Sequence, residues 1–281
     1  MTESPLLDVV VVTHDSGDVL AACLAPLTGH PDLTLVVVDS GSRSTTYLER
    51  FAAAGVRVVR QTNQGYGTSA NVGAALGSAP WLAVLNPDVV VDADTLRALV
   101  DRARDCAVDA LGPRLLDGEG REQDYPYRAT TPYWRRPFRW KTLQTFGTCR
   151  ETEVLNGSLV VFRRAVFERT GGFDTSFFLY AEEDDLVTRL RAAGARVARC
   201  ADVSAVHLHE QGSGEVPGEW RGSQRLRGRA QYVAKHYSSV EAFLDVCLNL
   251  HRLVRRYGPA GTVRVIRGAR VDPRASVTAP G

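Results

Sequence analysis

At residues 81–88 the chain reads Trp81-Leu82-Ala83-Val84-Leu85-Asn86-Pro87-Asp88. Five consecutive apolar residues bounded by turn residues are typical of a central strand of a parallel sheet, buried on both faces. Pro87 has no backbone N–H, so the strand must end there. Asp88 then lies just beyond the carboxyl end of a strand, where open α/β sheets bind ligands, and a carboxylate there suits a divalent cation that carries a diphosphate. The alternative is a plain turn in which Asp88 is solvated or caps the next helix.

The order strand, polar turn, helix occurs four times before residue 105. Apolar runs predict strands at 8–12, 33–38, 56–59 and 81–85, each followed by a helical pattern. This repetition predicts an α/β fold in which helices flank a mostly parallel sheet. The carboxyl ends of parallel strands meet at one edge of a sheet. We therefore expect one crevice there, lined by Asp15, Asp39, Gly65–Gly67 and Asp88.

Composition limits the classes of function. The 281 residues suffice for one large α/β domain or for a domain with a helical appendage. A net charge of +2 argues against a strong polyanion binder, and we expect no nucleic-acid partner. Arginines nevertheless cluster at 135–139, 221–229 and 252–270. Such clusters indicate either an anionic surface or substrate, or simply a solvated face.

Cysteine usage and hydropathy indicate the compartment. The five cysteines are widely spaced and contain no C-x-x-C pair, which argues for reduced thiols and against a zinc site or a disulfide framework. No apolar run approaches the roughly 18–20 residues of a membrane helix. The sequence therefore predicts a cytoplasmic protein, with at most peripheral contact at the inner face of the plasma membrane.

The second half is less periodic. Residues 117–150 hold several prolines and a segment, Tyr133–Lys141, in which aromatic residues alternate with arginines. That segment suits a sugar, a phosphate or a lipid headgroup, or it is a surface loop that covers the core. Further on, the pattern predicts a strand at 155–162, a helix at 183–193 and a strand at 196–200. A basic helical region follows at 222–257, and the last dozen residues resemble a tail.

Four adjacent acids, Glu182-Glu183-Asp184-Asp185, open the predicted helix at 183–193. Acids are favoured at helix N-termini, where they meet the helix dipole and unpaired N–H groups. Four like charges exceed what capping needs, however, and crowding raises the pKa of one member, as a general base requires. Capping and catalysis both remain open for this run.

Two further features could bind a substrate complex. His207 and His209 point to the same face if they lie on a strand, and either could complete a metal site with Asp88; structural or exposed histidines are the alternative. Gly65-Tyr66-Gly67 opens a helix after a strand and could cradle a phosphate, although the third glycine of the dinucleotide fingerprint is missing.

Together these motifs resemble those of the family 2 glycosyltransferases of the GT-A fold, in the branch typified by bacterial rhamnosyltransferases. The resemblance covers roughly residues 8–215. Its motifs stand here in the family's order: Val11-Val12-Thr13-His14-Asp15, Val37-Val38-Asp39-Ser40-Gly41-Ser42, Asn63-Gln64-Gly65-Tyr66-Gly67 with Asn71 and Gly73, Leu85-Asn86-Pro87-Asp88, Asn156-Gly157-Ser158, Gly171-Gly172-Phe173-Asp174, Phe178-Leu179-Tyr180, and His207 to Ser213.

The resemblance implies a role for each site residue. The nucleotide-sugar donor would be bound by Thr13, His14, Asp15, Asp39, Ser40, Gln64, Gly65, Tyr66, Asn71, Asn86 and Asp88. Asp88 would also ligate a divalent metal, Mg²⁺ or Mn²⁺, with His207 or His209. The acceptor would meet Trp134, Asn156, Gly157 and Glu182. The base would be Glu183, where the family usually has aspartate, or else Asp184 or Glu182, and Asp185 is a further catalytic candidate. Ala181 replaces an aromatic residue often found in the family.

The implied activity is a metal-dependent, inverting transfer of L-rhamnose or another deoxyhexose. The expected donor is a dTDP-sugar, with UDP- and GDP-sugars as alternatives. The expected acceptor is a saccharide, a lipid-linked saccharide or a small molecule, in cell-envelope polysaccharide or glycolipid assembly. A natural-product glycosyltransferase and a catalytically silent nucleotide-sugar-binding protein are the competing interpretations. A sugar-nucleotide pyrophosphorylase would need an early basic Gly-rich loop, which residues 13–18 do not supply.

The expected domains are a GT-A domain at 1–220 and a basic, mainly helical extension and tail at 221–281. Within the GT-A domain, residues 1–112 would bind the nucleotide-sugar and residues 113–220 the acceptor and the catalytic groups. Self-association as a homodimer stays open.

Overall fold

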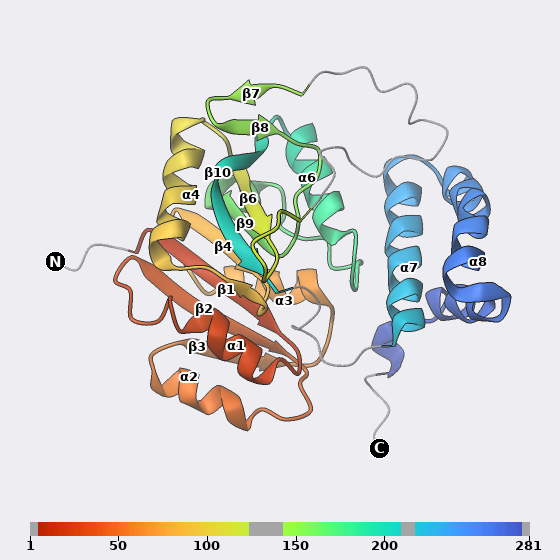
Figure 1. The fold of residues 1–281 in the computed structure, drawn as a ribbon, viewed down its shortest axis with the longest axis horizontal. Helices are drawn as coiled ribbons and strands as arrows, with labels where there is room; N and C mark the ends of the chain where they lie inside the picture. Colours follow the sequence, from red (N-terminus) through yellow and green to blue (C-terminus); the bar gives the residue numbers. More distant parts are fainter. Residues whose placement is uncertain (1–4, 124–142, 209–216, 277–281) are drawn as a thin grey trace.

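The computed structural model describes residues 5–123, 143–208 and 217–276. Trp134, His209 and the aromatic and arginine-rich segment 133–141 lie outside these ranges. A mixed sheet has the strand order β3-β2-β1-β4-β9-β6-β10-β8-β7, and β5 pairs with β10 (Figure 1). The strands are β1 (Leu7–Thr13), β2 (Leu33–Ser40), β3 (Arg57–Gln61), β4 (Trp81–Leu85), β5 (Val89–Val90), β6 (Ala110–Leu116), β7 (Thr145–Phe146), β8 (Cys149–Glu151), β9 (Leu159–Arg163) and β10 (Val197–His207).

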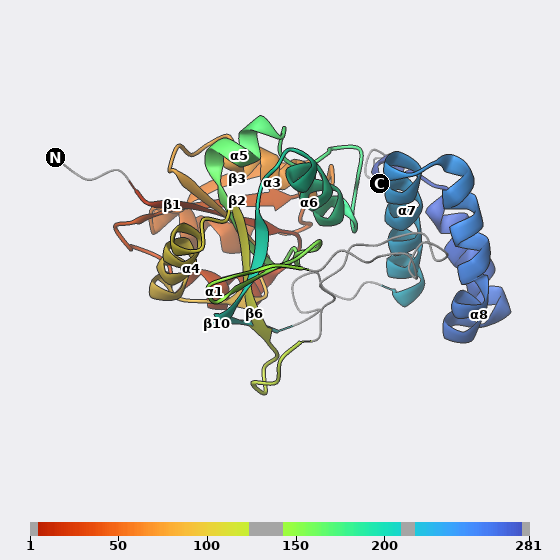
Figure 2. The same cartoon turned by 90° about the horizontal axis from the view of Figure 1, so that it is seen from above.

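Helices cover both faces of the sheet (Figures 1 and 2). They are α1 (Gly17–Leu24), α2 (Glu49–Ala53), α3 (Tyr66–Ala74), α4 (Ala93–Asp105), α5 (Arg164–Arg169), α6 (Glu182–Ala192), α7 (Gly218–His236) and α8 (Ser239–Ala269), with short 3₁₀ turns η1 (Thr46–Leu48) and η3 (Pro273–Ser276). The alternation of β1 explains the two layers. Val9 and Val11 join one apolar core cluster, whereas Val10 and Val12 join the cluster on the opposite face.

The first four predicted strands are confirmed as parallel neighbours, and β4 has the predicted bounds. The later strands need corrections. The predicted strand 155–162 begins only at Leu159, and as β9 it runs antiparallel between β4 and β6. The strand predicted at 196–200 continues to His207 past an irregularity in register. A buried apolar run shows burial on both faces, but it does not encode the direction of the strand.

The C-terminal helices are longer than predicted. Helical structure continues to Ala269, not 257, with a kink at Gly258, whose φ of 68° is not helical. Pro259 therefore occupies the first turn of the second helical segment, where proline is tolerated because no N–H is needed there. Figures 1 and 2 show α7 lying between α8 and the rest of the molecule. Whether residue 220 is a domain boundary stays a prediction.

Candidate active site

The carboxyl ends of β1 and β2 bring Asp15 and Asp39 to one rim of the predicted crevice, because Thr13 pairs in register with Asp39. Ser42 connects the two loops. Its backbone N–H donates to Asp39 Oδ1 at 3.3 Å, its hydroxyl also donates to Asp39, and that hydroxyl accepts from the backbone N–H of Asp15 at 2.7 Å. The two carboxylates predicted to bind the nucleoside thus lie on one hydrogen-bonded rim.

Asp15 is held ionised. Arg43 donates to its carboxylate from the backbone N–H and from Nε, both at 2.8 Å. Burial raises the pKa of Asp15, but the hydrogen bonds from Arg43 and the charges of His14 and Arg43 outweigh that effect, so the pKa lies below its usual value. His14 Nδ1 lies 2.8 Å from the carbonyl oxygen of Ser40, which fixes the imidazole on this rim.

The glycine loop at residues 65–67 packs against the backbone of Phe178 and is not an open loop. Gly65 has a φ of 100°, and a Cβ there would lie 2.4 Å from the carbonyl oxygen of Phe178. That carbonyl accepts from the Tyr66 N–H at 3.0 Å. Gln64 Nε2 donates to Thr62 at 3.2 Å. Only glycine fits position 65, since both the backbone angle and the close approach exclude a side chain; phosphate binding by this loop stays a prediction.

Two other predicted donor ligands are engaged within the protein. The side-chain amide of Asn71 makes two hydrogen bonds to the backbone of Phe173. Its Nδ2 donates to the Phe173 carbonyl oxygen at 2.8 Å, and its Oδ1 accepts from the Phe173 N–H at 2.9 Å. The Ser40 hydroxyl donates to Asn63 Oδ1 at 3.2 Å and accepts from Ser69 at 3.0 Å. These contacts give both side chains a structural role, and direct contact with the donor stays a prediction.

Tyr66 connects the donor side of the crevice with the acidic helix start. Its hydroxyl donates to the carbonyl oxygen of Gly157 at 3.0 Å. Burial first, and then the charges of Glu182, Glu183 and Asp88, raise the pKa of Tyr66 well above its usual value. The charges of the predicted metal ligand and of two acids at the start of α6 thus act on one phenol.

Asp88 faces His207 across the crevice. Both are buried, and Asp88 Oδ1 lies 3.5 Å from His207 Nε2. The other ring nitrogen, Nδ1, lies 2.9 Å from Gln123 Oε1, while Gln123 Nε2 donates to the His207 carbonyl oxygen at 2.7 Å. A carbonyl oxygen cannot donate, so the Gln123 amide must present its NH₂ there and its oxygen to the ring. His207 therefore carries a proton on Nδ1, which leaves Nε2 as the ring nitrogen that faces Asp88 and could ligate a metal.

This arrangement fits a divalent cation. Two ligands about 2.1 Å from one ion and cis to one another are about 3 Å apart, close to the observed separation of 3.5 Å. Among the residues that the structure describes, no group of three or more His, Cys, Asp or Glu is placed to hold a metal. Two protein ligands nevertheless suffice where the substrate diphosphate supplies the others, as is usual for Mg²⁺. The Asn86 N–H donates to the Ser158 carbonyl at 2.8 Å, which orients the turn before Asp88.

The acidic run begins α6 after two residues in the left-handed region. Tyr180 and Ala181 have φ of 67° and 69°, a conformation that costs a non-glycine residue about 1–2 kcal/mol. α7 packs directly on this turn, since a Cβ at Gly228 would meet the Tyr180 carbonyl oxygen at 2.2 Å. Such local strain is typical of functional sites.

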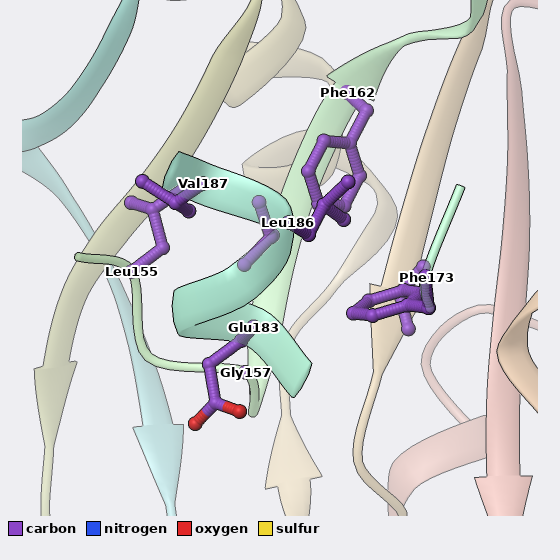
Figure 3. A pocket seen from close by; sticks show the side chains of 9 residues that line it. Leu155, Gly157, Phe162, Phe173, Glu183, Leu186 and Val187 are labelled. Carbon is purple, nitrogen blue, oxygen red and sulfur yellow. The ribbon is translucent and has the colours of Figure 1, made fainter. Parts of the chain in front are cut away.

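Glu183 is the acid nearest the acceptor-side loop. In Figure 3 its carboxylate extends from the first turn of α6 beside Gly157. Glu183 also lines a small apolar cavity of about 10 Å³, together with Leu155, Leu186 and Val187. Burial, followed by the charges of Glu182 and Asp184, raises the pKa of Glu183 well above its usual value. Burial and Asp184 likewise raise the pKa of Glu182 to about 7. Glu182 Oε2 is buried and has no hydrogen-bond partner among the described residues.

Asp185 differs from its neighbours. It is fully buried and accepts from Arg189 Nε at 2.7 Å and from Lys235 Nζ at 2.6 Å, and it lies 2.8 Å from His236 Nε2. Lys235 and His236 are on α7, so this carboxylate joins α6 to α7. A base role would require these contacts to break, whereas Asp184 is half-buried beside Glu183.

Asn156, a predicted acceptor contact, accepts from the Ser158 N–H at 3.0 Å and shapes the loop that presents Gly157. Other relevant residues were not assigned a role from the sequence. Gln123, Arg43 and Ser42 hold predicted site residues in place. Ser42 stands within a quoted motif, but nothing local distinguishes Gln123 or Arg43 from surface residues. Trp134 and His209 lie outside the described residues, so their predicted roles stay predictions.

Comparison with known proteins decides the family. The model for glycosyl transferase family 2 matches residues 8–171, more than half of the chain. The chain is a family 2 glycosyltransferase. This glycosyltransferase is 29% identical to an N-acetylglucosaminyl-diphospho-decaprenol L-rhamnosyltransferase of Mycobacterium tuberculosis (strain CDC 1551 / Oshkosh), over 85% of this chain and 84% of the relative. It is 30% identical to the O-antigen biosynthesis protein RfbC of Myxococcus xanthus, over 75% of this chain but 18% of that protein.

Solved structures agree on the GT-A fold of this glycosyltransferase. A mannosyltransferase from Pyrobaculum calidifontis, in complex with GDP-Man and Mn²⁺, superposes with a TM-score of 0.58 at 20% identity and covers 98% of this chain and 79% of its own. GalNAc-T7 with UDP, GalNAc and Mn²⁺ gives 0.61 at 14% identity, with 92% and 52% covered. The predicted fold class and enzyme class are confirmed; these structural relatives bind nucleotides or nucleotide sugars together with Mn²⁺.

Proposed function

We propose that this glycosyltransferase moves L-rhamnose from dTDP-L-rhamnose to a lipid-linked saccharide in cell-envelope glycan assembly. The names of two relatives support this choice of sugar and acceptor. One is an L-rhamnosyltransferase that acts on a decaprenol-linked acceptor, and the other is an O-antigen biosynthesis protein. The expected division of labour follows the chain, with the donor bound by residues 1–112 and the acceptor by residues 113–220.

One observation supports the chemistry above all. The Tyr66 hydroxyl donates to the carbonyl oxygen of Gly157, which packs against Glu183, and burial together with the charges of Glu182, Glu183 and Asp88 raises its pKa; Asp88 in turn lies 3.5 Å from His207. A displacement at an anomeric carbon needs a base for the acceptor hydroxyl and an electrophile for the departing diphosphate; an acid at the start of α6 would be the base, and Asp88 with His207 would hold the cation that serves as the electrophile. A divalent ion held by Asp88 and His207 would neutralise charge on the diphosphate.

In the proposed reaction the acceptor oxygen forms a bond to the anomeric carbon as the bond from that carbon to the diphosphate oxygen breaks. The electron pair leaves with the diphosphate, and the acceptor proton passes to Glu183. The raised pKa of Glu183 makes its carboxylate a stronger base than a solvated glutamate. One displacement inverts the configuration of the sugar.

A donor panel tests the proposal. The full chain is mixed with dTDP-L-rhamnose, UDP-N-acetylglucosamine or GDP-mannose, each with Mg²⁺, Mn²⁺ or EDTA. Thermal stabilisation and transfer to a short-chain prenyl-diphosphate-N-acetylglucosamine are then measured. We expect dTDP-L-rhamnose with metal to stabilise the protein most, by mass action, and to be the only donor that yields product. Product from another donor, or from none, would contradict the assignment.

A further inference from the structure

The first half of α8 has an exposed apolar face on the outside of the molecule. Phe243 and Val240 are each 68% exposed. The opposite side of the same helix is buried through Ala242 and Asp245. The α8 apolar face consists of Val240, Phe243, Leu244, Leu248, Leu250 and Val254, each 39% exposed or more.

This face is continuous along the helix. Residues at steps of three, four and seven fall on one side of an α-helix. Such steps relate Val240 to Phe243 and Leu244, Leu244 to Leu248, Phe243 to Leu250, and Leu250 to Val254. Single exposed apolar residues are ordinary on protein surfaces, but a contiguous row marks an interaction site. Within the described parts of the chain no helix is long and apolar enough to cross a membrane.

Positive charge adjoins the apolar face. Arg252, Arg255 and Arg256 follow its last turns and are exposed. Of the acids on this half of α8, Asp245 is buried in an ion pair with Arg229, which leaves Glu241 as the other carboxylate. An apolar row bordered by exposed arginines is the composition of helices that lie in a lipid interface, where arginines meet anionic headgroups.

The position of α8 relates this face to the candidate active site. α7 lies between α8 and the sheet domain in both views (Figures 1 and 2). Lys235 of α7 binds Asp185, and Gly228 contacts Tyr180 in the turn before Glu182. The α8 apolar face therefore lies one helix away from the start of the acidic run.

We infer that the α8 apolar face docks this protein on an anionic lipid bilayer, with the apolar side chains in the interface and the arginines among the headgroups. The inference rests on the proposed function, since a lipid-linked acceptor is presented at such a surface. The charge favours lipid over a second copy of this chain. In an antiparallel pair the three arginines of each copy would meet Glu241 of the other, which cannot balance them, and in a parallel pair they would meet one another, whereas anionic headgroups neutralise all three.

Vesicle flotation tests the inference. The full chain is floated with vesicles of 70:30 phosphatidylcholine and phosphatidylglycerol, and with pure phosphatidylcholine, at low and at high salt. We expect binding to the anionic vesicles that falls with salt. The F243E/L244E variant should lower the partition coefficient roughly tenfold or more, since two apolar side chains are lost from the interface. Replacing Arg252, Arg255 and Arg256 by alanine should lower it by roughly fivefold per residue.

Controls separate the possible failures. Ala52→Glu adds one acidic residue on an exposed position of α2 and should leave flotation unchanged. Transfer to the short-chain, water-soluble acceptor should survive in F243E/L244E, so loss of vesicle binding with intact transfer supports the inference. Intact transfer with no vesicle binding by the unmodified chain overturns it while the proposed function stands. Light scattering that shows a dimer disrupted by F243E/L244E, without vesicle binding, would assign the face to a second copy.

Discussion

At the crevice, Gln123 orients the side chain of His207, which in turn faces Asp88. Gln123 fixes the tautomer of His207, and His207 directs its Nε2 at Asp88. A histidine that donates through Nδ1 is a more basic and better oriented ligand at Nε2. Gln123 therefore acts on a bound ion through His207, not by contact.

Gln123→Met should weaken Mn²⁺ binding roughly 10–100-fold, because His207 can then rotate or change tautomer. Mn²⁺ affinity is measured by electron paramagnetic resonance in the presence of UDP, without turnover. Gln144→Met changes an exposed glutamine in the same way and should leave the affinity unchanged. In the His207→Ala background, Gln123→Met should have no further effect; a large second loss there would show that Gln123 does not act through His207.

Glu183 is the proposed base among the four acids. Glu183→Gln should lower transfer roughly 10²–10⁴-fold while donor affinity stays nearly constant, since only the proton acceptor is removed. Turnover is measured beside that of Asp184→Asn, with donor affinity measured by calorimetry for both. A nearly active Glu183→Gln variant together with an inactive Asp184→Asn variant would move the base to Asp184.

At the scale of elements, the start of α6 combines unfavourable backbone angles with repulsion between adjacent carboxylates. Two left-handed residues precede a helix whose first turn holds four acids, of which Asp185 is neutralised by contacts from α6 and α7. Glu182 and Glu183 instead have raised pKa values. The stability of this element should therefore depend on pH.

Because the pKa of Glu182 rises from 4.5 to about 7 on folding, the native state retains a proton that the unfolded chain releases between these values. The free energy of unfolding should fall as pH rises through this window, by up to roughly 3 kcal/mol, and the full loss should persist above it. Glu182→Gln should flatten this part of the profile and be more stable than the unmodified chain at pH 8. Urea unfolding at pH 5 and pH 8 measures this, with the exposed Glu49→Gln as control; an unchanged profile in Glu182→Gln would contradict it.

At the scale of the whole molecule, the chain returns to the crevice after α8. Arg274 Nε donates to the Gln64 carbonyl at 3.3 Å, and Nη2 donates to the carbonyls of Thr175 at 2.6 Å and Phe177 at 3.4 Å. The region expected to be a tail thus joins the glycine loop to the segment before α6, and it connects the two sides of the crevice.

Arg274→Ala should destabilise the protein by about 1–3 kcal/mol, since carbonyls lose a charged donor. Hydrogen exchange should rise in residues 64–66 and 175–178, and also in η3. Urea unfolding and exchange by mass spectrometry are measured beside Arg270→Ala, an exposed arginine at the end of α8. Equal effects of the two variants would show that the Arg274 contacts do not hold this region.

The amino-acid sequence alone determined the features that depend on neighbours in the chain. The run Trp81–Leu85 and the ring of Pro87 define β4 and its end, because burial pattern and backbone sterics act locally. The same reasoning placed Asp15, Asp39 and Asp88 at one edge of a sheet, since parallel strands share their carboxyl end.

Tertiary structure alone decided which distant residues meet. Gln123 reaches His207 across 84 positions, and Arg274 reaches Gln64 across 210. β9 is antiparallel although its apolar run would suit either direction. Periodicity shows which face of an element is buried, but not which element covers it or how they are aligned. Strand order and helix packing determine which elements meet and how they are aligned. They therefore also determine the tautomer of His207, the surroundings of Tyr66 and the ion pairs of Asp185.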